Sequence, residues 1–420
     1  MISVSIPKNH IFHLLTDDGR LLFLTRMARL FAYGSLAVVL VLYLSQIGVS
    51  QAKIGMLLTL ALLGDILVSL WITTIADRVG RKRMLVAGAA LMLFAGIVFA
   101  FTANYLLLVI AAIIGVISPG GNDIGPFMPI EQAALTQTVP GAQRTEVFAW
   151  YNLAGSLSTA IGALAGGVII QLLIGEGVTT LTSYRVIVLA YAATGLMLGL
   201  LYMRLSQAVE TPVARDSSIS PELFATRFGL HRSKEVVLKL SVLFALDAFA
   251  GGLVLQSIMA YWFHLRFGVE PALLGTIFFG ANTLAGLSAL AASRIASRIG
   301  LINTMVFTHI PSNLLLMLVP LMPNLPWAIT VLLLRFSISQ MDVPTRQSYT
   351  MSVVSPDEFS AAAGITVVAR STGAALSPIL AGLLLANPLL LNVPFFLAGS
   401  LKIVYDLLLF KNFRAIRENR

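Results

Sequence analysis

The chain of 420 residues contains no cysteine, and charged residues make up only 11% of it. Without cysteine there can be no disulfide, no thiol nucleophile and no metal site with thiolate ligands. Water-soluble domains carry about 25% charged residues, so the low charge argues against that class. The sequence also lacks G-x-x-x-x-G-K-[ST] and any His pair or acidic cluster with metal-ligand spacing. We therefore expect that the protein has no enzyme activity and binds no cofactor and no metal. Any energy that it uses must then come from the gradient of an ion or of a solute.

Long apolar runs dominate the chain instead. Hydrophobic residues form 57% of it, and the mean hydropathy is +0.88. A helix needs about 20 mostly apolar residues to cross the roughly 30 Å hydrocarbon core of a bilayer. The runs do not alternate like the strands of a membrane barrel, so we interpret them as helices that bond their own backbone. The twelve predicted spans are residues 21–46, 53–76, 83–102, 105–128, 146–174, 184–206, 236–264, 271–295, 301–322, 326–352, 358–386 and 389–411.

The second half of the chain repeats the first at an offset of about 220 residues, as the pairs Gly48 and Gly268 and Gly55 and Gly275 illustrate. Such repeats are typical of carriers built from two helical bundles around a central site. We predict an N-terminal six-helix bundle (residues 1–206), a cytoplasmic linker (residues 207–235) and a C-terminal six-helix bundle (residues 236–420).

The net charge of +9 comes from Lys and Arg in alternate loops, at residues 78–83, 204–239, 294–298 and 411–420. The opposite loops hold little beyond Lys53, Arg185 and Arg266. This bias is typical of cytoplasmic loops, so it predicts a multi-pass protein of the cell (inner) membrane with both termini in the cytoplasm. It also argues against nucleic-acid binding. The start of the chain has too few apolar residues for a signal peptide, so we expect the first helix to act as the signal.

The loop Asp77-Arg78-Val79-Gly80-Arg81-Lys82 resembles the signature G-x-x-x-D-R-x-G-R-K/R of the major facilitator superfamily, with Thr73 in place of the leading glycine. The second half keeps Arg298 and Gly300. The resemblance implies an all-α membrane protein with twelve transmembrane helices in two pseudo-symmetric bundles. It also implies a conformational latch formed by Asp77, Arg78, Gly80, Arg81 and Arg298. The alternative is that this loop only sets topology and caps a helix.

A second motif lies in the fifth predicted helix. Gly162-Ala163-Leu164-Ala165-Gly166-Gly167 resembles the antiporter motif G-P-x-x-G-G of the same superfamily, with alanine in place of proline. Ser377 to Gly382 in the eleventh helix looks like its repeat. Through Gly162, Gly166 and Gly167 the resemblance implies a drug/proton antiporter-like branch and hence export. The arginine that the family carries in the fourth helix is absent.

Charged side chains inside a bilayer cost roughly 2.5–3.5 kcal/mol on insertion scales, so they usually face a cavity or a partner. Helix 1 carries a polar face, and helix 10 carries a stripe of four polar residues that includes Ser339. The family resemblance implies that helices 1, 4, 7 and 10 line the cavity. Further charges lie at Asp65 in helix 2 and Arg370 in helix 11. The predicted substrate-binding residues are Arg26, Arg29, Tyr33, Asp123, Arg335, Asp342 and Arg346.

Alternatives remain for several of these residues. Arg26 and Arg29 can instead extend to the cytoplasmic surface. Asp342 and Arg346 can form an i,i+4 ion pair at the cytoplasmic end. Asp123 follows a Pro-Gly-Gly break in helix 4, which is either a site or merely the end of that helix. We expect Glu131, further along, to lie in a cytoplasmic extension.

Asp247 in helix 7 is the first candidate for proton coupling, and Asp123 is the second. Asp247 is flanked by apolar residues, so its charged form is costly and it should take up a proton readily. The alternative is a salt bridge to Arg26 or Arg29. We predict that Asp247→Asn abolishes pH-driven transport and leaves folding intact. His264 and His309 are expected to be structural.

Three functions follow from these features. The first is a secondary transporter that moves a small organic solute by alternating access, coupled to protons and directed outward. The second is an importer or exchanger of organic anions, favoured by the excess of intramembrane arginine over carboxylate. The third is a membrane receptor or scaffold that transports nothing, which would need no repeated, charge-lined cavity. The expected partners are a small-molecule substrate, protons and membrane lipid, with the protein acting as a monomer.

Overall fold

The computed structural model describes residues 15–123, 125–139, 144–210, 230, 232–355 and 358–414. Within these ranges the secondary structure is helical and contains no strand. Ten helical segments of the described part are long and apolar enough to cross a membrane. The all-helical prediction is therefore confirmed.

The N-terminal half contains five long continuous helices and one that is interrupted. The break in the fourth predicted span leaves the short helix α5, an irregular stretch and then α6, which continues ten residues beyond the predicted end. A short 3-10 turn, η2 (Gln207–Val209), follows α8, the last helix of this half. The helices are α2 (Asp17–Gln46), α3 (Gln51–Val79), α4 (Arg81–Phe101), α5 (Tyr105–Ile114), α6 (Phe127–Thr138), α7 (Arg144–Gly175) and α8 (Thr180–Tyr202).

The C-terminal half repeats this order with two interruptions. The seventh span breaks into α10 and α11, and the tenth span breaks into α14 and α15. The helices are α10 (Lys234–Gly252), α11 (Gln256–Phe267), α12 (Pro271–Ile299), α13 (Leu301–Leu318), α14 (Leu325–Phe336), α15 (Asp342–Ser352), α16 (Phe359–Leu385) and α17 (Val393–Phe413), with 3-10 turns η4 (Val319–Leu321) and η6 (Pro388–Leu390). Most of the predicted linker, residues 211–229 and 231, lies outside the described residues.

The helix ends follow local sequence rules. The side chain of Thr16 caps the start of α2 by accepting a hydrogen bond from the Gly19 N–H, and Asp17 and Asp18 occupy the first turn, where negative charge favours the helix dipole. Gly80 separates α3 from α4 with a φ of 113°, a conformation that favours glycine. The tight turn between these helices therefore depends on the glycine of the signature loop.

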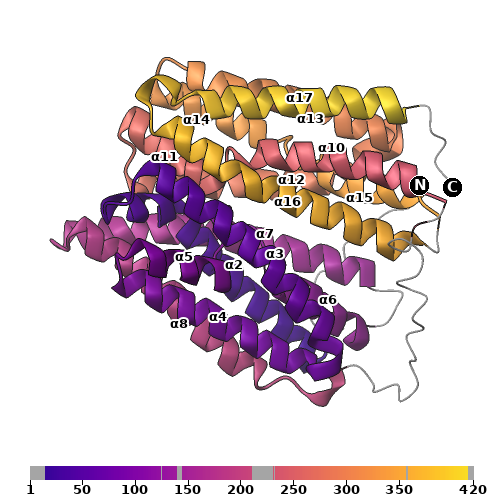
Figure 1. Ribbon diagram of the computed structural model, residues 1–420, viewed down its shortest axis with the longest axis horizontal. Coiled ribbons are helices and arrows are strands. Elements are labelled where there is room, and N and C mark those ends of the chain that lie inside the picture. The colour runs from indigo at the N-terminus through magenta and orange to yellow at the C-terminus, as the bar shows by residue number, and fades with distance from the viewer. Residues whose placement is uncertain are drawn as a thin grey trace.

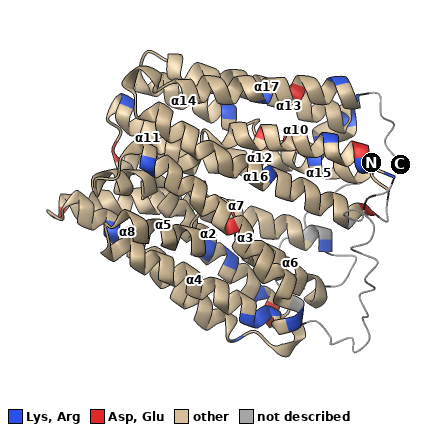
Figure 2. Cartoon of the chain, in the orientation of Figure 1, with Lys and Arg blue, Asp and Glu red and all other residues tan. Residues whose placement is uncertain are grey.

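The two halves form two bundles that lie side by side, with both chain ends at the same end of the molecule (Figure 1). We call this the termini end, and we call the opposite end, with the turns at residues 47–50 and 268–270, the far end. Between the bundles, α7 packs against α12, α3 against α16 and α2 against α11. The ribbons converge at the far end and diverge toward the termini end (Figure 1). Figure 2 shows Lys and Arg gathered at the termini end and isolated charged residues along the helices of both bundles.

Glycine allows the closest approach between the bundles. Gly167 of α7 lies so close to α12 that a Cβ atom added there would collide with the Pro271 carbonyl oxygen and lie 3.1 Å from Gly275 Cα. Gly55 of α3 makes the equivalent contact with α16, where an added Cβ would lie 2.9 Å from Gly382 Cα. Real Cβ atoms rarely approach other atoms so closely. The repeated glycines therefore seal the interface nearer the far end.

Candidate functional site

A buried ion pair joins α2 to α6 in the N-terminal bundle. Arg29 Nη1 lies 2.8 Å from Glu131 Oε1, and Arg29 Nη2 lies 2.8 Å from Glu131 Oε2. Both side chains are fully buried. Arg29 Nη2 also lies 3.1 Å from Asp123 Oδ1, in the stretch between α5 and α6. This two-pronged geometry needs the planar guanidinium of arginine.

Other polar groups complete this cluster. Arg26 Nη1 lies 3.2 Å from Asp123 Oδ2, and Arg26 Nη2 donates to Asn152 Oδ1 at 3.2 Å. The hydroxyls of Tyr151 and Tyr202 donate to Glu131 at 2.5 and 2.7 Å. Two arginines thus face two carboxylates, so the cluster is balanced in charge. We call Arg26, Arg29, Asp123 and Glu131 the N cluster.

The N cluster corrects two expectations. Glu131 does not lie in a cytoplasmic extension, because it is fully buried against Arg29. Arg26 and Arg29 do not extend to a surface, since they are 5% and 0% exposed. The physical reason is the break in helix 4, after which the irregular stretch and α6 lie against α2 and give both arginines a carboxylate. For Asp123, the break places its carboxylate in contact with both arginines.

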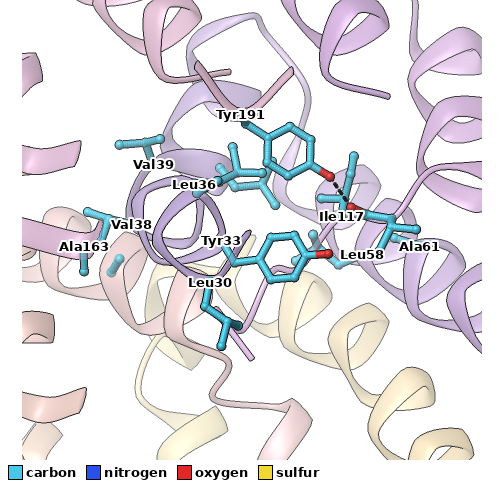
Figure 3. Close-up of a cluster of buried hydrophobic side chains, with 14 of the residues drawn as sticks. Leu30, Tyr33, Leu36, Val38, Val39, Leu58, Ala61, Ile117, Ala163 and Tyr191 are labelled. Carbon is cyan, nitrogen blue, oxygen red and sulfur yellow. Dashed lines mark hydrogen bonds between the residues drawn. The ribbon is translucent and has the colours of Figure 1, made fainter. Parts of the chain in front are cut away.

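Tyrosines hold the irregular stretch between α5 and α6 in place. The Tyr191 hydroxyl of α8 donates to the backbone carbonyl of Val116, and the Tyr191 ring stacks on Tyr33 with centroids 6.2 Å apart (Figure 3). The Tyr33 hydroxyl is buried and has no hydrogen-bond partner among the described residues. The Pro119 carbonyl accepts a hydrogen bond from the Ser257 N–H at the start of α11. The break in helix 4 is therefore in direct contact with the break in helix 7.

A second buried cluster surrounds Asp247 in the C-terminal bundle. Three cations contact this carboxylate, with Lys402 Nζ 2.5 Å from Oδ1 and Arg346 Nη1 and Arg370 Nη1 at 3.2 and 3.4 Å from Oδ2. Arg346 Nη1 also lies 2.8 Å from Asp342 Oδ2. We call Asp247, Asp342, Arg346, Arg370 and Lys402 the C cluster. It joins α10, α15, α16 and α17.

The C cluster corrects the prediction for Asp247. This residue is not isolated in an apolar environment, and its partners are not Arg26 or Arg29. The i,i+4 pair of Asp342 and Arg346 is confirmed, but it is buried rather than at a surface, with both residues 5% exposed. The sequence neighbours of Asp247 are apolar, whereas its spatial neighbours come from three other helices. Sequence reasoning missed Lys402, although a lysine inside the twelfth apolar run was a signal.

The two clusters are related by position and opposite in sign. In the N-terminal bundle the first helix carries arginines and the fourth carries carboxylates. In the C-terminal bundle the equivalent first helix carries Asp247, and the fourth carries Arg346. Each cluster therefore links the first helix of a bundle to the termini-end half of its broken fourth helix.

Arg335 lies outside both clusters. Its guanidinium stacks over the Phe336 ring at 4.8 Å, the residue is only 9% exposed, and its Nε has no hydrogen-bond partner within the described ranges. In the same ranges it forms no ion pair within 4.0 Å. Asp65 on α3 likewise forms no ion pair with a described residue; its carboxylate contacts Ser69 Oγ, at 3.5 Å, and the backbone of Gly125. Arg335 is thus a buried cation with unused hydrogen-bonding capacity.

In the signature loop, Glu210 contacts the start of α4. Glu210 Oε2 and Oε1 accept hydrogen bonds from the backbone N–H groups of Arg81 and Lys82, at 2.6 and 3.2 Å. The Arg81 side chain donates to the carbonyls of Ala133 and Val209 at 3.3 and 3.4 Å. The side chain of Asp77 lies outside the described residues, and those of Arg78 and Arg298 are exposed. The loop is thus fastened to α6 and to the short turn η2 that follows α8.

The glycines of the antiporter-like motif lie at helix contacts. A Cβ at Gly162 would collide with the Phe31 carbonyl oxygen of α2, and one at Gly166 would lie 3.0 Å from Ser35 Cα. Gly167 faces α12 of the other bundle. These glycines let α7 pack tightly between α2 and α12. Among the described residues, no group of three or more His, Asp or Glu is arranged to hold a metal ion.

Comparison with known proteins places this architecture in a family. The family model of the Major Facilitator Superfamily matches residues 22–378. An uncharacterized membrane protein of Saccharomyces cerevisiae is 31% identical over 423 residues, covering 95% of this chain and 94% of the relative.

Solved transporter structures share the fold. A bacterial homolog of the human lysosomal transporter Spinster, in an inward-facing and occupied conformation, superposes with a TM-score of 0.72 at 14% identity, covering 94% of this chain and 96% of the other. The nucleoside transporter NupG gives 0.73 at 14% identity and coverages of 96% and 100%. A D-xylose-proton symporter gives 0.70 at 15% identity and coverages of 96% and 98%. The chain is therefore a membrane protein that belongs to the Major Facilitator Superfamily of secondary transporters and has its fold.

Proposed function

We propose that this protein exports a small organic solute in exchange for protons, by alternating access between the two bundles. The observation that carries the proposal is the pair of buried charge clusters, one in each bundle. Each cluster holds ionised groups where burial is costly, and each spans helices that are interrupted near mid-length. Such groups are retained in membrane proteins mainly for a function.

The clusters supply a physical basis for coupling. A ligand shifts a conformational equilibrium only by its difference in affinity for the two states. A proton or a charged solute that enters either cluster changes the net charge of that cluster, so an ion pair must weaken or a new one must form. Because the ion pairs fasten α6 to α2 and α15 to α10, their rearrangement would change the packing of the termini-end helix halves.

We further propose that the termini end faces the cytoplasm of the cell (inner) membrane. The absence of cysteine makes the test direct. Lys53→Cys lies at the start of α3 and Arg83→Cys at the start of α4, and both positions are exposed at opposite ends of one helix pair. In intact cells, a membrane-impermeant maleimide should label Lys53→Cys and not Arg83→Cys. The reverse pattern would invert the topology, and labelling of both would contradict the helix assignment.

A second candidate function, import or exchange of an organic anion, is favoured by Arg335. A buried guanidinium without an ion pair is suited to a carboxylate or phosphate. Arg335→Lys keeps the charge but loses the planar pair of donors, so it should weaken binding of an anion, and Arg335→Ala should weaken it further. Equal affinity in wild type and both variants would remove Arg335 from the site and favour export of a neutral or cationic solute.

The central experiment identifies the solute and then measures coupling. A thermal-shift screen of the purified protein against a solute panel finds ligands, because a ligand that binds only the folded state stabilises it. Proteoliposomes with the solute and a pH-sensitive dye inside then report solute efflux and proton entry together. We expect solute efflux and proton entry to occur only together. We also expect the monomeric protein to carry out both. Solute movement without proton movement would contradict the proposed coupling.

A further inference from the structure

A histidine and an aspartate are buried together between α13 and α17. His309 Nδ1 lies 2.9 Å from Asp406 Oδ1, and Asn313 Nδ2 donates to Asp406 Oδ2 at 3.3 Å. His309 is 5% exposed, and Asp406 and Asn313 are fully buried. Neither α13 nor α17 is one of the helices expected to line the solute pathway. The pair is therefore a polar site separate from the polar stripes of helices 1 and 10.

The histidine ring stands between two carboxylates. Its other nitrogen, Nε2, lies 3.9 Å from Asp247 Oδ1, the same oxygen that Lys402 contacts. An ionised Asp406 accepts a hydrogen bond from Nδ1–H, so the neutral ring carries its proton there and leaves Nε2 free. A proton added to the ring then forms an N–H bond at Nε2, directed toward Asp247.

The surrounding charges make histidine the variable group. Around it lie three carboxylates (Asp247, Asp342 and Asp406) and three cations (Arg346, Arg370 and Lys402). With a neutral ring the sum is zero, and with a protonated ring it is +1. Histidine is the side chain whose charge ordinarily changes between about pH 5 and 8.

The remaining neighbours of α13 do not supply another partner for the ring. Tyr405 of α17 meets it edge-on with ring centroids 6.0 Å apart. Helices α12 and α14 also pack on α13, and their ionisable side chains are Arg294, Arg298 and Arg335. Within the described residues none of these three forms an ion pair with Asp247 or Asp406. Asp247 is thus the group through which a charge on the ring acts on α15 and α16.

We propose that His309, held by Asp406, is the binding site of the coupled proton, and that its charge regulates how strongly Asp247 holds Arg346 and Arg370. A protonated ring is a fourth cation at Asp247 and competes with the arginines for the carboxylate. Release of these arginines loosens α15 and α16 from α10. Proton and solute then bind at different sites, and the ion pairs of Asp247 connect them. This inference rests on the proposed proton coupling and corrects the interpretation of His309 as structural.

The first test needs no solute. In the purified protein labelled with ¹⁵N-histidine and recorded over about pH 5 to 8, where the charge of imidazole ordinarily changes, we expect one resonance, absent from the His309→Gln spectrum, to report uptake of a proton by the ring. A His309 resonance that is constant over this range would overturn the proposal.

The second test separates driven transport from exchange in proteoliposomes, using a solute found in the thermal-shift screen. His309→Gln should reduce pH-gradient-driven flux relative to solute exchange by about 5- to 150-fold, the range typical of coupling between two sites. The matched control is His264→Gln, whose ring Nδ1 contacts only the Val269 carbonyl, at 3.0 Å near the far end, and which should keep both activities. Equal loss of both activities in a folded His309→Gln, or retention of driven flux, overturns the inference. If the flux through the wild-type protein does not respond to the pH gradient, the proposed function is contradicted. The histidine spectrum then still reports whether His309 binds a proton.

Discussion

The ammonium group of Lys402 on α17 lies 2.5 Å from the carboxylate of Asp247 on α10. Since Arg346 and Arg370 also contact Asp247, one carboxylate fastens α10 to three other helices. A buried charge that loses its partner is strongly destabilising, because its desolvation is no longer compensated. The stability of the C-terminal bundle should therefore depend on Asp247.

We predict that Asp247→Asn destabilises the protein as well as impairing transport. The substitution leaves two buried cations, Arg346 and Lys402, and the partly exposed Arg370 without this carboxylate, and breaking a buried ion pair typically costs about 3–5 kcal/mol. Thermal unfolding in detergent measures the effect. Glu235→Gln is the matched control on the same helix, because Glu235 forms only an exposed pair with Lys239 and its loss should not shift the melting temperature. Equal melting of both variants would restore the earlier expectation that Asp247→Asn leaves folding intact.

The antiporter-like motif is open to a packing test. We predict that Gly162→Ala lowers both expression and melting temperature, because the added methyl group meets the Phe31 carbonyl of α2. Overpacking of this kind typically costs about 1–3 kcal/mol. Gly175→Ala lies on the same helix with nothing within 4 Å of the added Cβ, so it should leave the protein unchanged. If both variants behave like wild type, tight packing is not the reason for glycine at residue 162.

Periodicity and apolar run length predicted the helices well. The predicted span 271–295 is α12, which runs from Pro271 to Ile299, and 301–322 begins where α13 does. The breaks were predicted only in helix 4, where Pro119, Gly120 and Gly121 occur together. In helix 10, residues 337–341 contain neither Pro nor Gly, but Pro344 follows in the first turn of α15, where it cannot donate to the Gln340 carbonyl and its ring crowds that carbonyl. The interruption therefore had a local signal that was not recognised, and the hydrogen bond from the Gln340 N–H to Ser288 Oγ of α12 adds a tertiary contact there.

The site was harder to predict than the fold. Charged residues inside apolar runs marked Arg29, Asp123 and Asp247 correctly as unusual. Their partners depend on which helices meet in space, and a single sequence does not contain that information. The pairing of Arg29 with Glu131, 102 positions apart, arises because α6 packs against α2. For the same reason His309 was interpreted as structural and Asp406 was not identified. Lys402, four positions before Asp406, is the only charged residue within four positions of either one along the chain.

Glu210 is expected to stabilise the signature loop. Its carboxylate accepts from two N–H groups in the first turn of α4, where a negative charge also favours the helix dipole. Glu210→Ala should lower stability by about 0.5–2 kcal/mol, the usual range for the loss of a helix cap. Glu176→Ala, in the exposed turn after α7, is the control and should have no effect on thermal unfolding. An unchanged melting temperature in Glu210→Ala would show that water replaces the cap without cost.

Tyr261 of α11 fastens the two bundles at the far end. Its hydroxyl accepts a hydrogen bond from Gln51 Nε2 at 3.1 Å and lies 3.1 Å from Ser45 Oγ, both in the N-terminal bundle. The same region contains a small cavity lined by Gln51, Gly55, Leu58, Tyr261 and Pro378 among others. Opening of the far end must break these contacts.

We predict that Tyr261→Phe raises the population of the conformation that is open at the far end. A hydrogen bond contributes about 0.5–1.5 kcal/mol, so loss of one should raise that population about two- to tenfold. Leu58→Cys is a suitable reporter, because Leu58 is fully buried beside Tyr261 and the chain has no other cysteine. Its labelling rate by a small maleimide should rise by that factor in Tyr261→Phe. Tyr105→Phe removes a hydroxyl that donates to the Lys53 carbonyl within the N-terminal bundle, so it should leave the labelling rate unchanged. If Tyr261→Phe also leaves it unchanged, the hydroxyl does not hold the bundles together, and the apolar and glycine contacts of α2, α3, α11 and α16 alone close the far end.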